Sequence, residues 1–375
     1  MTAPAATTVA STPAELFVGW DAIELWVGNA RQAAAWFASG FGFRLAGYSG
    51  PETGDRATAA YLLEQGSIRL VVRGALHDDH PVARHALHHG DGVKVLAIEV
   101  VDATEAHDLA VARGARSVTP PTVTQDDAGR VVWSEIESYG ETVHRFVERR
   151  DYAGVYLPGF RADGLPPDPA GPAVGLERID HVVGNVELGR LGDWVRHYED
   201  VLGFEQLVHF DDDQISTEYS ALMSTVVWDG GSKVVMPINE PAAGRKKSQI
   251  EEYLEFYEGP GVQHLALRTD DIVGAVAALR SRGIRFLSVP DAYYDEARQR
   301  MAGIELPWAE LQRLGILVDR DPDGHLLQVF TEPITHRPTL FLEIIQREGA
   351  KGFGAGNFKA LFEAIEREQA RRGNL

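Results

Sequence analysis

Hydrophobic and polar positions along the chain change repeatedly from a strand-like alternation to a helical period. The pattern predicts a strand over residues 20–26, then a helix over 30–41 that ends at Gly42. Further strands are predicted over residues 56–64, 67–74 and 93–100, and in the later part over 219–228, 232–238, 316–319, 325–331 and 339–346. Ser248 and Glu251 have the spacing of a capping box, which predicts a short helix through Tyr257. A final helix, 357–372, has one apolar stripe and Asn357 at its start.

Part of this pattern occurs twice. The stretch that begins at Gly92 can be laid without a gap on the stretch that begins at Gly261, which places Val95 opposite His264. A looser match joins Asp21-Ala22 to Asp180-His181, and another puts Phe146 opposite Glu343. The chain is therefore predicted to consist of two similar halves, each built from two strand–helix–strands modules.

The repeat and the local composition predict the domain boundaries. Residues 1–18 are expected to be a disordered tail, 19–155 a first domain, and 177–375 a second domain. Residues 156–176 are rich in proline and glycine, which is typical of a linker between domains.

Composition excludes several classes of site. The net charge of −19 and the absence of a sizeable Lys/Arg cluster argue against binding to nucleic acid or to an anionic membrane. No apolar stretch has the length of a membrane span, so we expect a soluble, cytoplasmic protein. The chain has no cysteine, which leaves only nitrogen and oxygen ligands for any metal.

Three residues of the second half are candidate metal ligands. His181 and His264 occupy corresponding points of its two modules, and Glu343 lies in a strand too apolar to hold an unpaired carboxylate. Burying that charge alone would cost several kcal/mol, so it needs a cation. Two imidazoles and one carboxylate are the ligand set of non-haem Fe(II) oxygenases. The first half lacks all three, because Ala22, Val95 and Phe146 stand opposite them, and it is expected to be metal-free.

Two other patterns resemble metal sites but favour other interpretations. Residues 319–324 imitate the start of a calcium loop, yet Phe330 stands where the bidentate Glu should be. A group of histidines in the first half is expected to form a solvated face, although two of them have helical i, i+4 spacing. These histidines are His77, His80, His85, His88 and His89.

Several runs of the second half strongly resemble the 4-hydroxyphenylpyruvate dioxygenases, a family of the vicinal-oxygen-chelate (glyoxalase-like) superfamily. The matching runs include Asp180-His181-Val182-Val183-Gly184-Asn185, Pro237-Ile238-Asn239-Glu240-Pro241, Gly261-Val262-Gln263-His264, Phe341-Leu342-Glu343 and Gly352-Phe353-Gly354-Ala355-Gly356-Asn357-Phe358. The resemblance implies an α+β fold, in which tandem βαβββ modules form two open β-barrel domains. It also implies that the C-terminal helix acts as a lid, which Gly352, Gly354 and Gly356 would allow to move.

The resemblance further implies an Fe(II) enzyme that converts 4-hydroxyphenylpyruvate and O2 into homogentisate and CO2 in tyrosine catabolism. The substrate is itself an α-keto acid, and its keto and carboxylate oxygens would chelate the iron. Decarboxylation of this keto acid would generate the oxidant that attacks the substrate ring. Such enzymes are usually dimers or tetramers, so a homo-oligomer is expected.

The residues that the resemblance assigns to the site fall into two groups. His181, His264 and Glu343 would bind the metal, and Gln249 and Phe358 would also take part in catalysis. The substrate contacts would be Ser224, Asn239, Gln249, Gln263, Gln328, Phe330, Phe341, Phe353, Asn357 and Phe358. Gln263 does not fit simply, because strand alternation turns it away from His264. It would reach the pocket only through a bulge, or else support a metal ligand.

Three alternatives stay open. A 4-hydroxymandelate synthase uses the same iron and substrate but hydroxylates the benzylic carbon; Phe358 and Pro-Ile-Asn-Glu-Pro favour ring hydroxylation instead. A metal-dependent glyoxalase or an extradiol dioxygenase would share the module without these pocket runs. A non-enzymatic binding protein of the same module fold would not need the three ligands.

Overall fold

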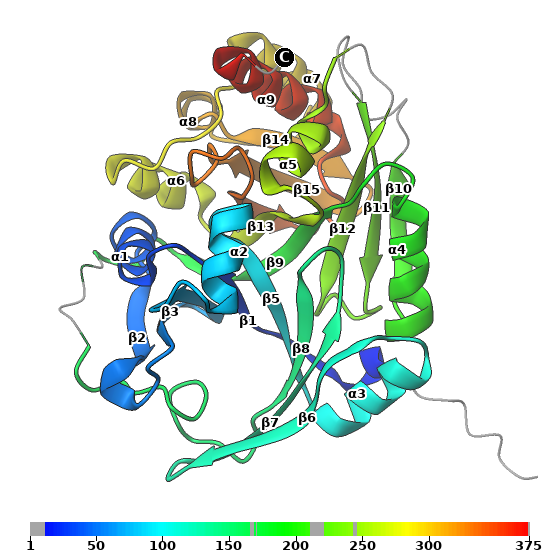
Figure 1. Ribbon diagram of the computed structural model, residues 1–375. Coiled ribbons are helices and arrows are strands. Elements are labelled where there is room, and N and C mark those ends of the chain that lie inside the picture. The colour runs from blue at the N-terminus through cyan, green and yellow to red at the C-terminus, as the bar shows by residue number, and fades with distance from the viewer. Residues whose placement is uncertain (1–11, 166–168, 170, 211–220, 243–245, 374–375) are drawn as a thin grey trace, which may run out of the picture.

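The computed structural model describes residues 12–165, 169, 171–210, 221–242 and 246–373. Two eight-stranded mixed sheets each curve into a half-barrel, so the predicted fold class is confirmed (Figure 1). Helices pack against both sheets, and α5 and α9 lie over the second sheet. None of the described helices is both long and apolar enough to cross a membrane.

The first sheet has the order β2-β3-β4-β1-β5-β8-β7-β6. Its strands are β1 (Phe17–Trp26), β2 (Arg44–Ser49), β3 (Thr58–Gln65), β4 (Ile68–Ala75), β5 (Gly92–Val100), β6 (Ser117–Asp126), β7 (Gly129–Glu137) and β8 (Val143–Glu148). Its helices are α1 (Ala30–Phe41), α2 (Pro81–His89) and α3 (Ala103–Ala112). Asn29 and Asp102 cap α1 and α3 by accepting backbone N–H groups, and Gly42 ends α1 in the left-handed conformation.

The second sheet repeats this order as β10-β11-β12-β9-β13-β16-β15-β14. Its strands are β9 (Leu176–Asn185), β10 (Glu205–Phe210), β11 (Ala221–Trp228), β12 (Val235–Ala242), β13 (Gly261–Thr269), β14 (Leu317–Asp321), β15 (Gly324–Phe330) and β16 (Phe341–Glu348). Its helices are α4 (Leu191–His197), α5 (Gln249–Tyr257), α6 (Ile272–Ser281), α7 (Asp291–Arg300), α8 (Trp308–Leu314) and α9 (Phe358–Arg372). The sequence patterns did not reveal α7 and α8.

Each half has the same strand pairing at its centre. The first strands of its two modules pair antiparallel, β1 with β5 and β9 with β13. Each of them also pairs in parallel with the last strand of its own module, as β13 does with β16. Residues far apart in the sequence are thereby placed on neighbouring central strands. These central strands carry the residues on which the site depends.

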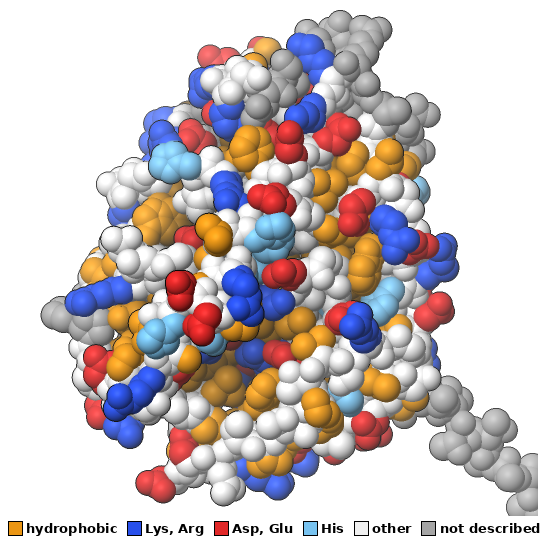
Figure 2. Space-filling model, viewed as in Figure 1, with side chains coloured by type: hydrophobic (Ala, Val, Ile, Leu, Met, Phe, Trp, Pro, Cys, Tyr) orange, Lys and Arg blue, Asp and Glu red, His pale blue; other side chains and the backbone are white. Residues whose placement is uncertain are grey.

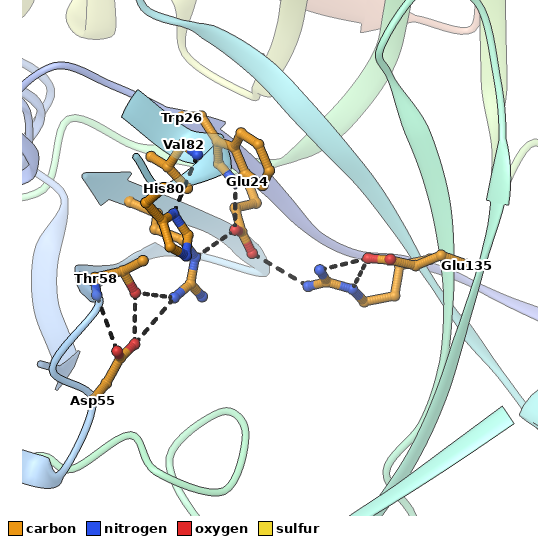
Figure 3. A network of polar contacts seen from close by, with 9 residues as sticks. Glu24, Trp26, Asp55, Thr58, His80, Val82 and Glu135 are labelled. Atoms are coloured by element: carbon orange, nitrogen blue, oxygen red, sulfur yellow. Dashed lines mark hydrogen bonds and ion pairs between the residues drawn. The ribbon is translucent and has the colours of Figure 1, made fainter. Parts of the chain in front are cut away.

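A network of buried charged side chains lies inside the first half-barrel. Glu24 is 2% exposed and pairs with Arg73 at 2.7 Å and with Arg145 at 3.2 Å. Arg145 also binds Glu135 at 2.7 Å, so the charges neutralise one another within one network (Figure 3). Burial raises the pKa of Glu24, but the two arginines outweigh it and hold this pKa at about 2.

Two predicted boundaries need correction. The tail was predicted to reach residue 18, but a 3-10 helix forms over Pro13–Leu16 and β1 starts at Phe17, which is buried. The start of the predicted linker, residues 156–176, packs into the first domain. Its Tyr156 and Phe160 are buried against Ala22 and Val95, because their large rings fill the space that small side chains leave.

Candidate metal centre and substrate pocket

His181, His264 and Glu343 lie together on the three central strands of the second half, β9, β13 and β16. Ala266 of β13 pairs with His181 on one side and with Glu343 on the other. His264 lies two residues from Ala266, on the same face of β13. The Nε2 atoms of both histidines are 3.3 Å from Oε2 of Glu343, and all three side chains are buried.

The electrostatics of these side chains fit a bound cation. Burial raises the pKa of Glu343, but His181 and the hydrogen bonds from both imidazoles hold it at about 2. Burial would lower the pKa of His181, yet Glu343 and Asp180 raise it to about 9. Burial lowers the pKa of His264. The second carboxylate oxygen of Glu343, Oε1, is buried without a hydrogen-bond partner, as expected for a ligand that requires a metal.

Outer hydrogen bonds fix both imidazoles. Asp180 accepts a hydrogen bond from Nδ1 of His181 at 2.7 Å and is held by two bonds from Arg347, each of 2.8 Å. Gln263 Oε1 accepts one from Nδ1 of His264 at 3.0 Å. When each ring is neutral, these bonds place its proton on Nδ1, so Nε2 can bind a metal in place of its contact with Oε2 of Glu343.

A bulge explains the position of Gln263. The pairing of β13 with β9 shifts register between Val262 and His264, so the simple alternation of faces fails at this point. Gln263 consequently lines the same pocket as His264 and also contacts its ring. Both of the placements considered for Gln263 from the sequence are therefore present in the structure.

An aromatic pocket of about 80 Å³ opens onto the three ligands. Nine of the ten predicted substrate contacts line it: Ser224, Asn239, Gln249, Gln263, Gln328, Phe330, Phe341, Phe353 and Phe358. Phe341 stacks on His264 with ring centroids 4.8 Å apart, and Phe353 meets His181 edge-on at 5.2 Å. Gln249 is the first residue of α5, whose predicted capping box by Ser248 and Glu251 is confirmed.

Asn357 was predicted to contact the substrate and to cap α9, but it lies outside the pocket lining and forms no side-chain cap bond. Its side chain is fully buried outside the pocket lining, where Oδ1 accepts a hydrogen bond of 2.6 Å from the hydroxyl of Tyr293. Its backbone is already helical and no side-chain cap bond forms. The buried tyrosine of α7 therefore competes successfully for the asparagine oxygen.

Several other residues that line the pocket were not predicted from the sequence. They include Val183, Phe210, Leu222, Val226, Pro237, Leu361 and Phe362. Alternation along β11 could have identified Leu222 and Val226, which flank Ser224 on the same face. Leu361 belongs to the apolar stripe predicted for the final helix, and it lines the pocket. Phe210, whose ring is 4.9 Å from that of Phe358, gives no comparable pattern.

The sequence that imitates a calcium loop anchors the glycine-rich segment before α9. Asp321 accepts hydrogen bonds from the backbone N–H groups of Lys351 and Gly352, and Asp319 accepts one from Gly356. A Cβ atom on Gly356 would lie 2.5 Å from Asp319. The carboxylates therefore hold backbone amides, and this glycine is needed for their close approach.

The first half has a different set of residues at the equivalent positions. Ala22 and Val95 stand opposite His181 and His264 as expected, since Ala97 of β5 pairs with Ala22 as Ala266 pairs with His181. The equivalent of Glu343 was predicted to be Phe146, which is wrong. Ala97 pairs with Arg145 of β8, so Arg145 takes the place of the carboxylate.

The interpretation of the histidines in the first half as a solvated face is wrong for two of them. His85 and His89 are 2% and 4% exposed, because α2 packs this face against the end of α5. His85 contacts Glu141, and His89 lies against Tyr257. Trp26 of β1 meets the ring of His85 edge-on, and Tyr257 of the other half lies against both rings. These neighbours are distant in the sequence, so the local pattern could not reveal the burial.

Comparison with known proteins shows the family. The model of the Glyoxalase/Bleomycin resistance protein/Dioxygenase superfamily matches residues 19–137 and 178–329. The chain is 47% identical to a 4-hydroxyphenylpyruvate dioxygenase of Caenorhabditis elegans, over 96% of this chain and 94% of that protein. It is 45% identical to one of Yarrowia lipolytica, over 95% of this chain and 93% of that protein.

The chain belongs to the 4-hydroxyphenylpyruvate dioxygenase family, and it is an enzyme of that family. A solved mutant of 4-hydroxymandelate synthase from Streptomyces coelicolor is also similar, with a TM-score of 0.84 and 33% identity. It covers 94% of this chain and 99% of its own. The family's fold thus also serves an enzyme named for a different product.

Proposed function

We propose that this 4-hydroxyphenylpyruvate dioxygenase family member uses Fe(II) to convert 4-hydroxyphenylpyruvate and O2 into homogentisate and CO2. The observation that carries the proposal is the buried His181–His264–Glu343 set, with an unpartnered carboxylate oxygen, at an aromatic pocket. The reaction balances, because one oxygen atom of O2 enters the new carboxylate and the other enters the ring. Fe(II), when bound, would supply chelation of the keto acid and activation of O2.

The protein residues have separate tasks in this proposal. His181, His264 and Glu343 would hold the metal, and Asp180 and Gln263 would keep the two imidazoles in the required tautomer. The phenyl rings around the pocket would hold the substrate ring and exclude water, while its amide and hydroxyl side chains would bind the polar groups of the substrate.

The size of the pocket supports a moving lid. A volume of about 80 Å³ is room for only a few water molecules and is too small for an aromatic keto acid. Phe358, Leu361 and Phe362 of α9 form part of the wall, so a shift of this helix would enlarge the pocket. We therefore include α9 as a lid that opens for the substrate and closes on it. We further propose a cytoplasmic homo-oligomer, a dimer or tetramer, that serves tyrosine catabolism.

Product identification tests the proposal. Metal-stripped full-length protein is supplied with Fe(II), 4-hydroxyphenylpyruvate and O2, and the products are separated by chromatography and identified by mass. We expect stoichiometric uptake of O2 and release of homogentisate. A main product of 4-hydroxymandelate would refute ring hydroxylation and favour the synthase. Binding of the keto acid without turnover, unaffected by a chelator, would favour a binding protein.

A further inference from the structure

A second group of metal-binding side chains lies in the first half, away from the pocket. His85 and His89 are on α2, and Glu141 is in the turn between β7 and β8. Nδ1 of His85 is 2.8 Å from Oε2 of Glu141, and Nε2 of His89 is 3.4 Å from the same oxygen. The two imidazoles are buried, whereas the carboxylate is half exposed beside a surface cleft. Histidine and acidic side chains are visible over the region of α2 (Figure 2).

The hydrogen bond that His89 forms through Nδ1 indicates what can lie between its Nε2 atom and Glu141. Nδ1 of His89 contacts the backbone carbonyl of Tyr257, at the end of α5. A carbonyl oxygen only accepts, so Nδ1 must carry a proton, and in the neutral form of the ring Nε2 then presents a lone pair. That lone pair faces a carboxylate oxygen. Two acceptors at this distance are compatible only with a cation between them, which is either a metal ion or a second proton on the ring.

Lys94, the nearest lysine, does not supply the cation between His89 and Glu141. Lys94 donates to the backbone oxygen of Glu141, and its ammonium lies 5.1 Å from the centre of the Trp26 ring. His88 is likewise occupied, since it pairs with Glu258 at 3.2 Å. Lys94 attracts the carboxylate of Glu141 from a distance, and the two imidazoles are the direct partners of this carboxylate.

The donor set indicates the class of ion. Histidines at i and i+4 lie on one face of a helix, and with one carboxylate they form a ligand set that Zn(II) commonly takes. Ca²⁺ and Mg²⁺ prefer oxygen ligands alone. A carbonyl that orients the far nitrogen of a ligating histidine is also the usual outer partner in such sites. The cleft leaves room for water as a further ligand.

We propose that His85, His89 and Glu141 form a second metal site, which binds a divalent transition-metal ion of the Zn(II) class. The ion would fasten α2 to the β7–β8 turn. Through His89 and Tyr257 it would also hold the first half against α5 of the second half. His85, His89 and Glu141 do not line the substrate pocket, so the role of this ion would be structural.

Stoichiometry of Zn(II) binding tests the site. Metal-stripped full-length protein is dialysed to equilibrium against Zn(II), and bound metal is counted by elemental analysis. We expect two ions in the unchanged protein, one in His264→Ala, one in Glu141→Gln, and none in the double variant. Glu141→Gln is isosteric and lies at the surface, so the fold should be preserved. A matched control is His107→Gln, which changes a buried histidine bonded to Ser117 and should leave two ions.

Affinity and stability give independent readouts. In the His264→Ala background, Glu141→Gln should weaken Zn(II) binding by about 100-fold or more, since even outer partners of ligands commonly contribute 10–100-fold. Zn(II) should raise the melting temperature of His264→Ala, and this rise should disappear in the double variant.

The outcomes separate this proposal from the proposed function. Two ions retained in Glu141→Gln, or no ion in folded His264→Ala, would overturn the second site and leave a protonated His89 as the cation. A single ion in the unchanged protein that is lost in Glu141→Gln but kept in His264→Ala would support the second site and contradict the iron ligands instead.

Discussion

The first half-barrel has Ala22, Val95 and Arg145 where the second has His181, His264 and Glu343. The strand order and pairing around these positions are the same in both halves. In the first half the charge of Arg145 is neutralised by Glu24 and Glu135, while Tyr156 and Phe160 fill the interior. In the second half one carboxylate oxygen is left without a partner beside a cavity. The backbone provides equivalent positions, and the side chains alone decide whether they become a site.

Replacing His264 with valine, the residue at the equivalent position of the first half-barrel, should have the largest effect on turnover. His264→Val removes a central ligand while keeping a residue suited to a strand, so we expect loss of the active-site metal and a fall in turnover of at least about 100-fold. Elemental analysis and O2 uptake measure the two losses. Val95→Ala, at the equivalent place, should lower stability without changing turnover. Normal activity of His264→Val would show that the ligand assignment is wrong.

Breaking the charge network of the first barrel should reduce stability rather than turnover. Glu24→Gln leaves Arg73 and Arg145 buried with incomplete compensation, which should cost about 3–5 kcal/mol of unfolding free energy. Urea denaturation followed by circular dichroism measures this cost, and turnover of the folded variant should be nearly unchanged. Glu64→Gln, which affects a more exposed pair with Arg44, is the control and should cost less than about 1 kcal/mol. Equal costs would mean that burial of the network is unimportant.

The same network predicts a pH dependence. The pKa of Glu24 is lower in the folded protein, at about 2, than its ordinary value of 4.5. Its contribution to stability, about 3 kcal/mol, is therefore complete above pH 4.5 and is lost as the pH falls from 4.5 through 2. The difference in unfolding free energy between the unchanged protein and Glu24→Gln should shrink over this interval. A difference that stays constant on acidification would contradict the assignment.

The smallest effect is expected from a substitution in α9, the proposed lid, and it concerns the ratio of products. Phe358 faces the pocket and packs edge-on against Phe210, so Phe358→Ile should loosen the hold on the substrate ring. We expect a few-fold shift in products towards 4-hydroxymandelate or uncoupled decarboxylation, on the order of 1 kcal/mol. Product ratios by chromatography measure it. Ile365→Val, on the same helix but outside the pocket lining, should leave the ratio unchanged.

The sequence predicted those features that local periodicity and internal repetition encode. The gapless repeat identified Val95 as the counterpart of His264, and apolar context marked Glu343 as a buried charge that needs a cation. Errors arose where long-range packing decides. The register of β8 determines that Arg145, not Phe146, is the counterpart of Glu343. Burial of His85 and His89 depends on α5 of the other half, and Tyr293 of α7 draws Asn357 away from the pocket.

The parallel pairing of β13 with β16 has a consequence for how the protein folds. A parallel pair cannot be closed by a tight turn, and here α6, α7, α8 and the β14–β15 hairpin lie between the two strands. Such non-local pairing forms slowly, because the loop entropy is lost before the contacts are gained. We therefore expect the third ligand, Glu343, to join His181 and His264 late in folding. Active-site metal should then act mainly by slowing unfolding, and it should do little to accelerate folding.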